Sequence, residues 1–166
     1  MIAAAELTVA SQMFRCNNGY ITRSIAGLSP EEWNSRPNES SNSMLWIVGH
    51  CVWARTMTLK ALGVPWAGWE ANPWLALFKR GSSPEAIAQY PSHEVIVGAW
   101  HDVDAALSAA LEGTSEATLA ASAGEKSPSF DGTIGGLINF LAHHEAYHAG
   151  QAAYLRRLLG HDGVAG

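Results

Sequence analysis

The stretch FLAHHEAYHAGQ, Phe140–Gln151, places three histidines, a glutamate and a glutamine in the middle of a segment that otherwise has the pattern of an apolar helix. Seven residues in and around it recur at alternating spacings of four and three: Leu137, Leu141, His144, His148, Gln151, Leu155 and Leu158. Such spacing places side chains on one face of a helix. We therefore predict a helix from Thr133 to Leu159 whose core-facing stripe is polar in its middle.

These polar layers need partners, because burying an imidazole or an amide without one costs about 1–3 kcal/mol. Residues four apart on a helix are neighbours, so His144 and His148 can each turn one ring nitrogen toward a single metal ion. His143 points about 100° away from that pair and is expected to lie outside it. The alternative is that the histidines are ordinary core residues bonded to backbone or water.

The substring HEAYH, His144–His148, also matches the zincin pattern H-E-x-x-H, in which two histidines bind zinc and the glutamate activates water. A metzincin would need glycine and histidine at two later positions, which here are Gln151 and Tyr154. No glutamate follows Glu145, and the strands expected beside a zincin helix have no counterpart in the sequence pattern. The pattern therefore argues against a protease of this kind.

A third metal ligand is expected upstream, in LWIVGHCVWAR, where His50 lies in the middle of another predicted helix. Trp46, His50, Trp53 and Met57 share one stripe, so the imidazole should lie between two indoles. Three histidines leave coordination positions open, as in catalytic rather than structural zinc sites. Three further histidines are expected to be solvated rather than to bind metal: His93, His101 and His161.

Helical periodicity accounts for four long segments, and no alternating strand pattern competes with them. The sequence thus predicts an all-α fold, a four-helix bundle with long crossover connections, in a single domain spanning residues 1–166. Ser29, Pro30 and Glu32 indicate a short capped turn after the first helix. The predicted long helices are Ile2–Ala26, Ser43–Leu62, Ser92–Leu111 and Thr133–Leu159.

The connection after the second long helix is rich in aromatic residues, which polar surface loops do not usually carry. We expect it to fold back over one end of the bundle, either as a lid on the metal pocket with an apolar floor for substrate, or as a packing or dimer contact. Its large aromatic residues are Trp66, Trp69, Trp74 and Phe78.

Composition restricts the function classes. Charged residues make up 15% of the chain, the net charge is −5 and the basic residues are scattered, so we expect no nucleic-acid partner. No apolar run approaches a membrane span, and no basic leader opens the chain, so we expect a cytoplasmic protein with no membrane partner. Cys16 and Cys51 are expected to be reduced.

Together, Gly49-His50, the HxxxHxGQ motif of His144, His148, Gly150 and Gln151, and LSPEEW after the first helix resemble the DinB-like superfamily (DinB/YfiT-like) of metal-binding four-helix bundles. The resemblance covers essentially the whole chain. It implies a crossover bundle, often a homodimer, with a divalent metal, zinc or nickel, held by His50, His144 and His148. Some relatives transfer low-molecular-weight thiols such as bacillithiol, mycothiol or glutathione, while others are classed as metal-dependent hydrolases. Family members often carry an acidic residue shortly after the first histidine, where this chain has Ala54 and Arg55.

The leading hypothesis is a metal-dependent enzyme for a small-molecule substrate, in which an open coordination position activates a thiol or water. Glu145 is a candidate general base or a flanking polar residue, and Gln151 is expected to orient a ligand or a bound water. Tyr147 could donate to a substrate oxygen or pack between helices, and Asn17 could support the site or be a bonded core amide. The alternative function is a non-catalytic metal-binding or stress-related ligand-binding module.

Overall fold

The computed structural model describes residues 2–82 and 89–164, and within these ranges the fold is all-α. Four long helices dominate it, and each of their ends lies within one residue of the predicted boundary. They are α1 (Ile2–Ile25), α3 (Met44–Ala61), α5 (His93–Glu112) and α7 (Ile134–Leu158). The connections carry four short helices: α2 (Pro30–Asn34), α4 (Gly68–Ala71), the 3-10 helix η1 (Pro73–Phe78) and α6 (Glu116–Ala120).

Side-chain caps explain where several helices begin. The Ser43 hydroxyl accepts a hydrogen bond from the Trp46 amide at the start of α3, and the Thr133 hydroxyl accepts from the Gly136 amide at the start of α7. Ser29 and Glu32 form the reciprocal capping box of α2, which confirms the predicted turn. Each cap satisfies backbone donors that the first turn of a helix leaves free.

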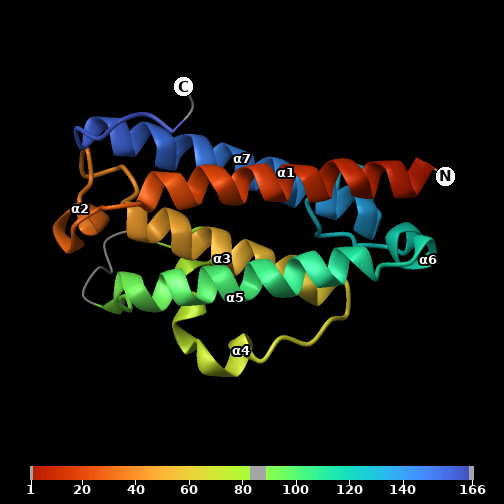
Figure 1. Cartoon of the computed structure of the whole chain (residues 1–166). Coiled ribbons are helices and arrows are strands. Elements are labelled where there is room, and N and C mark those ends of the chain that lie inside the picture. Colours follow the sequence, from red (N-terminus) through yellow and green to blue (C-terminus); the bar gives the residue numbers. More distant parts are fainter. Residues whose placement is uncertain (1, 83–88, 165–166) are drawn as a thin grey trace.

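The long helices are arranged so that α1 packs on α7, and α3 packs on both α5 and α7. Figure 1 shows α1 and α7 running in one direction, and α3 and α5 in the other. The connection from α3 to α5 therefore returns along the length of the molecule, whereas the one from α5 to α7 turns back near α6. This arrangement fits a four-helix bundle with one long crossover, between α3 and α5.

Helix α3 is the most enclosed of the long helices, because α2, α5, α7 and η1 all pack against it. Its buried residues face every direction around its axis, as in a helix that is apolar all round. Two of the polar side chains that α3 carries inside are large, and these two, His50 and Arg55, are only 3% and 0% exposed. Each must therefore find its partners within the protein.

The aromatic connection after α3 does not fold over an end of the bundle as expected. It lies along the side of the bundle, where α4 contacts α5 and η1 contacts α3 (Figure 1). The reason is a specific contact at the middle of α3: a β-carbon on Gly49 would lie 2.5 Å from the Phe78 ring. The absence of a side chain at Gly49 thus lets η1 dock against α3 directly beside His50.

None of the helices in the described ranges is long and apolar enough to span a lipid bilayer.

Candidate metal centre

Three histidines from two helices converge where α3 meets α7. His50 comes from α3, and His144 and His148 come from successive turns of α7. The Nε2 atom of His144 lies 3.4 Å from that of His50 and 3.2 Å from that of His148. One ligand atom from each residue lies within 4.8 Å of the others, so the three side chains could hold a metal ion.

Hydrogen bonds fix the tautomers of two of these imidazoles. The Nδ1 of His50 donates to the Phe78 carbonyl oxygen at 2.6 Å, and the Nδ1 of His148 donates to Oε1 of Gln151 at 2.7 Å. A carbonyl oxygen can only accept, so in both rings the hydrogen is on Nδ1 and the lone pair is on Nε2. Metal-binding histidines have the same arrangement, with the outer nitrogen donating to an oxygen.

This donor set fits a divalent ion better than it fits an ordinary polar core. The bare Nε2 atoms of His50 and His148 both face Nε2 of His144, which carries at most one hydrogen and cannot satisfy both. The Nδ1 of His144 is buried and has no hydrogen-bond partner among the described residues. A cation at the centre would accept all three lone pairs and relieve their mutual repulsion.

Burial also keeps the imidazoles uncharged. Burial first, and repulsion from a positive charge on His50 second, lower the pKa of His144 to about 4 and that of His148 to about 3. The pKa of His50 is lowered mainly by burial. All three rings are therefore neutral at pH 7, as metal ligands must be.

Aromatic rings hold the histidines in place. Trp46 stacks on His50 at a centroid distance of 4.7 Å, and Trp53 stacks on His50 at 5.4 Å. These two contacts confirm the predicted position of His50 between two indoles. Phe140 stacks on His144 at 6.0 Å. Since aromatic rings in such contacts restrict rotation, they add to the orientation set by the hydrogen bonds.

Gln151 lies where the sequence places a residue that orients a ligand. Its Oε1 holds His148, and its Nε2 donates to the Tyr147 hydroxyl at 3.0 Å. Tyr147 is 61% exposed, so it does not pack between helices. Asn17 is a bonded core amide, since it is buried and donates to the Ala142 carbonyl at 3.0 Å.

Glu145 has a different environment from the one that a general base requires. It is 1% exposed, and both of its oxygens accept from Arg55, at 2.6 Å from Nε and 2.9 Å from a terminal nitrogen. It does not belong to the histidine group. The predicted core-facing stripe of α7 left out Glu145 and included Leu158. Because α7 packs on α1 as well as on α3, Glu145 is buried, whereas Leu158 is 52% exposed.

The other histidines lie outside the cluster. His101 and His143 are exposed, while His93 stacks on Trp33 and His161 contacts the Glu32 carboxylate at 2.7 Å. Sequence reasoning thus separated them correctly from the three clustered histidines, although His93 and His161 have protein partners rather than solvent alone.

Two contacts at or near the candidate site were not predicted from the sequence. Nothing in the residue pattern pointed to the Phe78 carbonyl, because a backbone acceptor leaves no mark on residue type. The Arg55–Glu145 pair did leave a signal: a single arginine in a helix that is otherwise apolar requires a buried anion. Arg55 also binds Asp104 and lies 3.9 Å from the centre of the Trp100 ring.

Comparisons with known proteins found a matching family model and a solved structure of similar fold. The family model of the DinB superfamily matches residues 19–152, a range that includes all three clustered histidines. The crystal structure of a conserved protein from Enterococcus faecalis is similar to the chain, with a TM-score of 0.76 over 93% of this chain and 97% of that one. The two share 18% sequence identity, so this likeness speaks for the fold alone. A search of curated proteins found no match.

Proposed function

Since the chain belongs to the DinB superfamily, we propose that it is a metal-dependent enzyme in which His50, His144 and His148 hold a divalent ion, zinc or nickel, for the activation of a thiol or a water molecule. The observation that carries this proposal is the convergence of three Nε2 atoms. In two of the rings, His50 and His148, a hydrogen bond from Nδ1 to Phe78 or Gln151 leaves the lone pair on Nε2.

His50, His144 and His148 would hold the ion, which would offer an open coordination position and lower the pKa of a thiol or water that binds there. The protein contributes neutral ligands, fixed ring orientations and aromatic walls. Trp46 and Trp53 cover both faces of His50, so solvent reaches that ligand poorly.

The reaction class we propose is attack of the activated sulfur or oxygen on an electrophilic small molecule. Glu145 is not the base in this scheme, because its oxygens bind Arg55. Tyr147 is better placed to assist: its oxygen accepts from Gln151, which leaves its own O–H free to donate to a substrate oxygen.

The first test is metal content. Protein purified without chelator or histidine tag should contain about one equivalent of divalent metal by plasma mass spectrometry. His50→Ala should lose it, whereas His143→Ala should keep it, because His143 is the exposed neighbour of a proposed ligand. Absence of metal in the wild type, even after reloading, would refute the proposal.

The second test is turnover by the metal-loaded protein. We expect acceleration either of the attack of a cellular thiol on a chloronitrobenzene, or of the hydrolysis of a nitrophenyl ester, and its loss in His50→Ala. Bound metal with neither activity would instead favour a non-catalytic metal-binding or ligand-binding module.

A further inference from the structure

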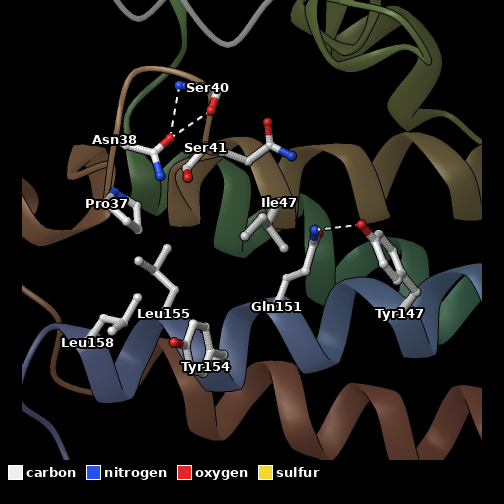
Figure 2. Close-up of a pocket in the computed structure, with 11 residues that line it drawn as sticks. Pro37, Asn38, Ser40, Ser41, Ile47, Tyr147, Gln151, Tyr154, Leu155 and Leu158 are labelled. Atoms are coloured by element: carbon white, nitrogen blue, oxygen red, sulfur yellow. Dashed lines mark hydrogen bonds between the residues drawn. The ribbon is translucent and has the colours of Figure 1, made fainter.

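A groove of about 620 Å³ lies beside the histidine cluster, between the segment that precedes α3 and the outer face of α7. Its size falls within the roughly 300–1,000 Å³ of small-molecule sites. Figure 2 shows polar side chains of residues 37–42 facing the side chains of α7, with Ile47 between them. The described residues that line it are Pro37, Asn38, Ser40, Ser41, Asn42, Ile47, Tyr147, Gln151, Tyr154, Leu155 and Leu158.

The lining is divided chemically into two halves, and neither half contains a charged side chain among these described residues. The polar half consists of carboxamides and hydroxyls. The side chains of Ser41 and Asn42 make no hydrogen bond within the described ranges, and the amide nitrogen of Asn38 points toward the groove (Figure 2). The other half is apolar and aromatic, and includes Tyr154, which is 65% exposed.

The groove shares a wall with the metal centre. Gln151 lines the groove, and the same side chain accepts the hydrogen bond from Nδ1 of His148. Tyr147 lines it too, accepts from Gln151, and contacts the His148 ring edge-on at 5.1 Å. A molecule in the groove would therefore touch Gln151 and Tyr147, which both contact His148, a proposed metal ligand.

We propose that this groove binds the uncharged, hydroxyl- or amide-bearing part of the small molecule that reacts at the histidine cluster, with a flat apolar face of the ligand against Tyr154 and Leu155. The inference rests on the function proposed above and specifies the substrate class of the same site.

The chemistry of the lining selects this class. Hydroxyls and carboxamides both donate and accept, so they suit a ligand that carries many groups of the same kind. Aromatic and aliphatic side chains on the opposite wall favour a flat apolar surface. An anionic ligand would lose hydration in the groove without gaining a cation from the lining, which disfavours its binding.

A matched pair of probes tests the proposal: phenyl β-D-glucopyranoside, which is neutral, and phenyl β-D-glucuronide, which differs by one carboxylate. Binding is followed by NMR titration of ¹⁵N-labelled protein. We expect shifts at the side-chain amides of Asn38, Asn42 and Gln151, and an affinity about tenfold higher for the glucoside than for the glucuronide. In cobalt-loaded protein the glucoside's proton signals should broaden, because the groove adjoins the histidines.

Variants sharpen the test. Tyr154→Ala should weaken both probes, and Asn42→Lys should improve glucuronide binding about tenfold by supplying a cation. Val95→Ala, which changes an exposed apolar side chain on α5, should change neither affinity. Equal affinity for the two probes, shifts that map elsewhere, or a dimer that Tyr154→Ala dissolves would overturn the proposal; the last result would assign the groove to a second copy of the chain.

Failure of the groove and failure of the proposed function give different results. Glucoside binding should persist in His50→Ala, since His50 does not line the groove. If the protein binds metal but not the glucoside, the proposal for the groove is wrong and the proposed function is unaffected. If the protein binds the glucoside but takes up no metal, the proposed function is wrong, and so is the proposed role of the groove in a reaction at the cluster.

Discussion

At the scale of single residues, the chemistry of the histidine cluster depends on which nitrogen of each ring carries the hydrogen. Gln151 decides this for His148, because its Oε1 accepts from Nδ1 at 2.7 Å. Gln151 in turn is oriented by its own amide hydrogen bond to Tyr147. One uncharged side chain therefore links the proposed metal ligand to the outer groove.

We predict that Gln151→Leu lowers the affinity for zinc by about 10–100-fold, because His148 loses the acceptor that fixes its tautomer and ring orientation. Competition with a chromophoric chelator at neutral pH measures this. Tyr147→Phe is the matched control: it removes the phenol hydroxyl and its hydrogen bond from Nε2 of Gln151, but keeps the bond between Oε1 of Gln151 and His148. The affinity should therefore change by less than about threefold. Equal losses in the two variants would contradict the assignment.

The lowered pKa values of the histidines determine how the stability of the metal-free protein responds to acid. Their pKa falls from 6.5 to about 4 at His144 and about 3 at His148 on folding, so below pH 6.5 the unfolded chain binds more protons than the folded one. Stability must then fall as the pH drops from 6.5 toward these lower values. Urea unfolding of metal-free protein at about pH 7 and about pH 5 should show this loss, and the loss should be smaller in His148→Leu. An identical loss in both proteins would assign it to other groups.

At the scale of elements, the contact between η1 and α3 builds part of the cluster. Gly49 allows the Phe78 ring to approach α3, and the Phe78 carbonyl then reaches Nδ1 of His50. The close approach and the hydrogen bond come from the same residue of η1. Displacing the ring should therefore disturb the ligand as well as the packing.

Gly49→Ala is expected to destabilise the protein by about 1–3 kcal/mol, since the new β-carbon would overlap the Phe78 ring. It should also weaken zinc binding, by moving the acceptor of His50. Gly98→Ala in α5 is the control, because a β-carbon there meets nothing within 4 Å. That variant should be neutral or more stable by up to about 1 kcal/mol, as expected for alanine in a helix. Chemical denaturation of both variants checks the pair, and equal stability of the two would refute this account.

The ion pair between α3 and α7 is a second contact between elements close to the cluster. Arg55 of α3 contacts Glu145 of α7, Asp104 of α5 and the Phe14 carbonyl of α1, so one buried guanidinium links α3 to the other three long helices. Burial raises the pKa of the Glu145 carboxyl, and the charge of Arg55 opposes that rise. Glu145 lies in α7 between His144 and His148, so the ion pair and the histidine cluster share the contact between α3 and α7.

Removing one partner should be more harmful than removing both. Glu145→Leu is predicted to lower the free energy of unfolding by about 3–5 kcal/mol, because it leaves the Arg55 charge without its main counter-ion. Arg55→Met combined with Glu145→Leu should recover much of that loss, since a well-packed apolar pair replaces the buried charges. Urea denaturation of the single and double variants measures the difference. A double variant that is as unstable as the sum of the two single ones would contradict this view.

At the scale of the whole molecule, the candidate site exists only in the folded state. His50 and His144 are 94 positions apart in the chain, and the packing of α3 on α7 brings them together. The crossover between α3 and α5 adds η1, which supplies the acceptor for His50. Any ligand of the assembled cluster should therefore stabilise the entire fold.

We predict that zinc at a concentration of about 100 times its Kd raises the free energy of unfolding by about 2.7 kcal/mol. Thermal unfolding with and without zinc measures the effect as a rise in Tm. His50→Ala should show a much smaller rise, while His143→Ala should behave like the wild type. A zinc-dependent rise of equal size in His50→Ala would place the bound ion elsewhere.

Much of the fold was predictable because it depends on local rules. The spacing of apolar residues defines the four long helices, and the Ser43 and Thr133 caps mark the starts of α3 and α7. The spacing of four between His144 and His148 places both on one side of α7. The position of His50 between Trp46 and Trp53 follows from the same geometry. These relations lie within one helix, so the sequence by itself determined them.

Only the tertiary structure decided the contacts between elements. The partner of Glu145, the direction in which the aromatic connection returns, and the backbone oxygen that holds His50 all depend on how separate helices pack. The helical pattern of α7 could not show that α1 would bury the flank of its predicted stripe. Local spacing determines which side chains share a face, whereas the burial of that face and the atoms that meet it depend on the simultaneous packing of the whole chain.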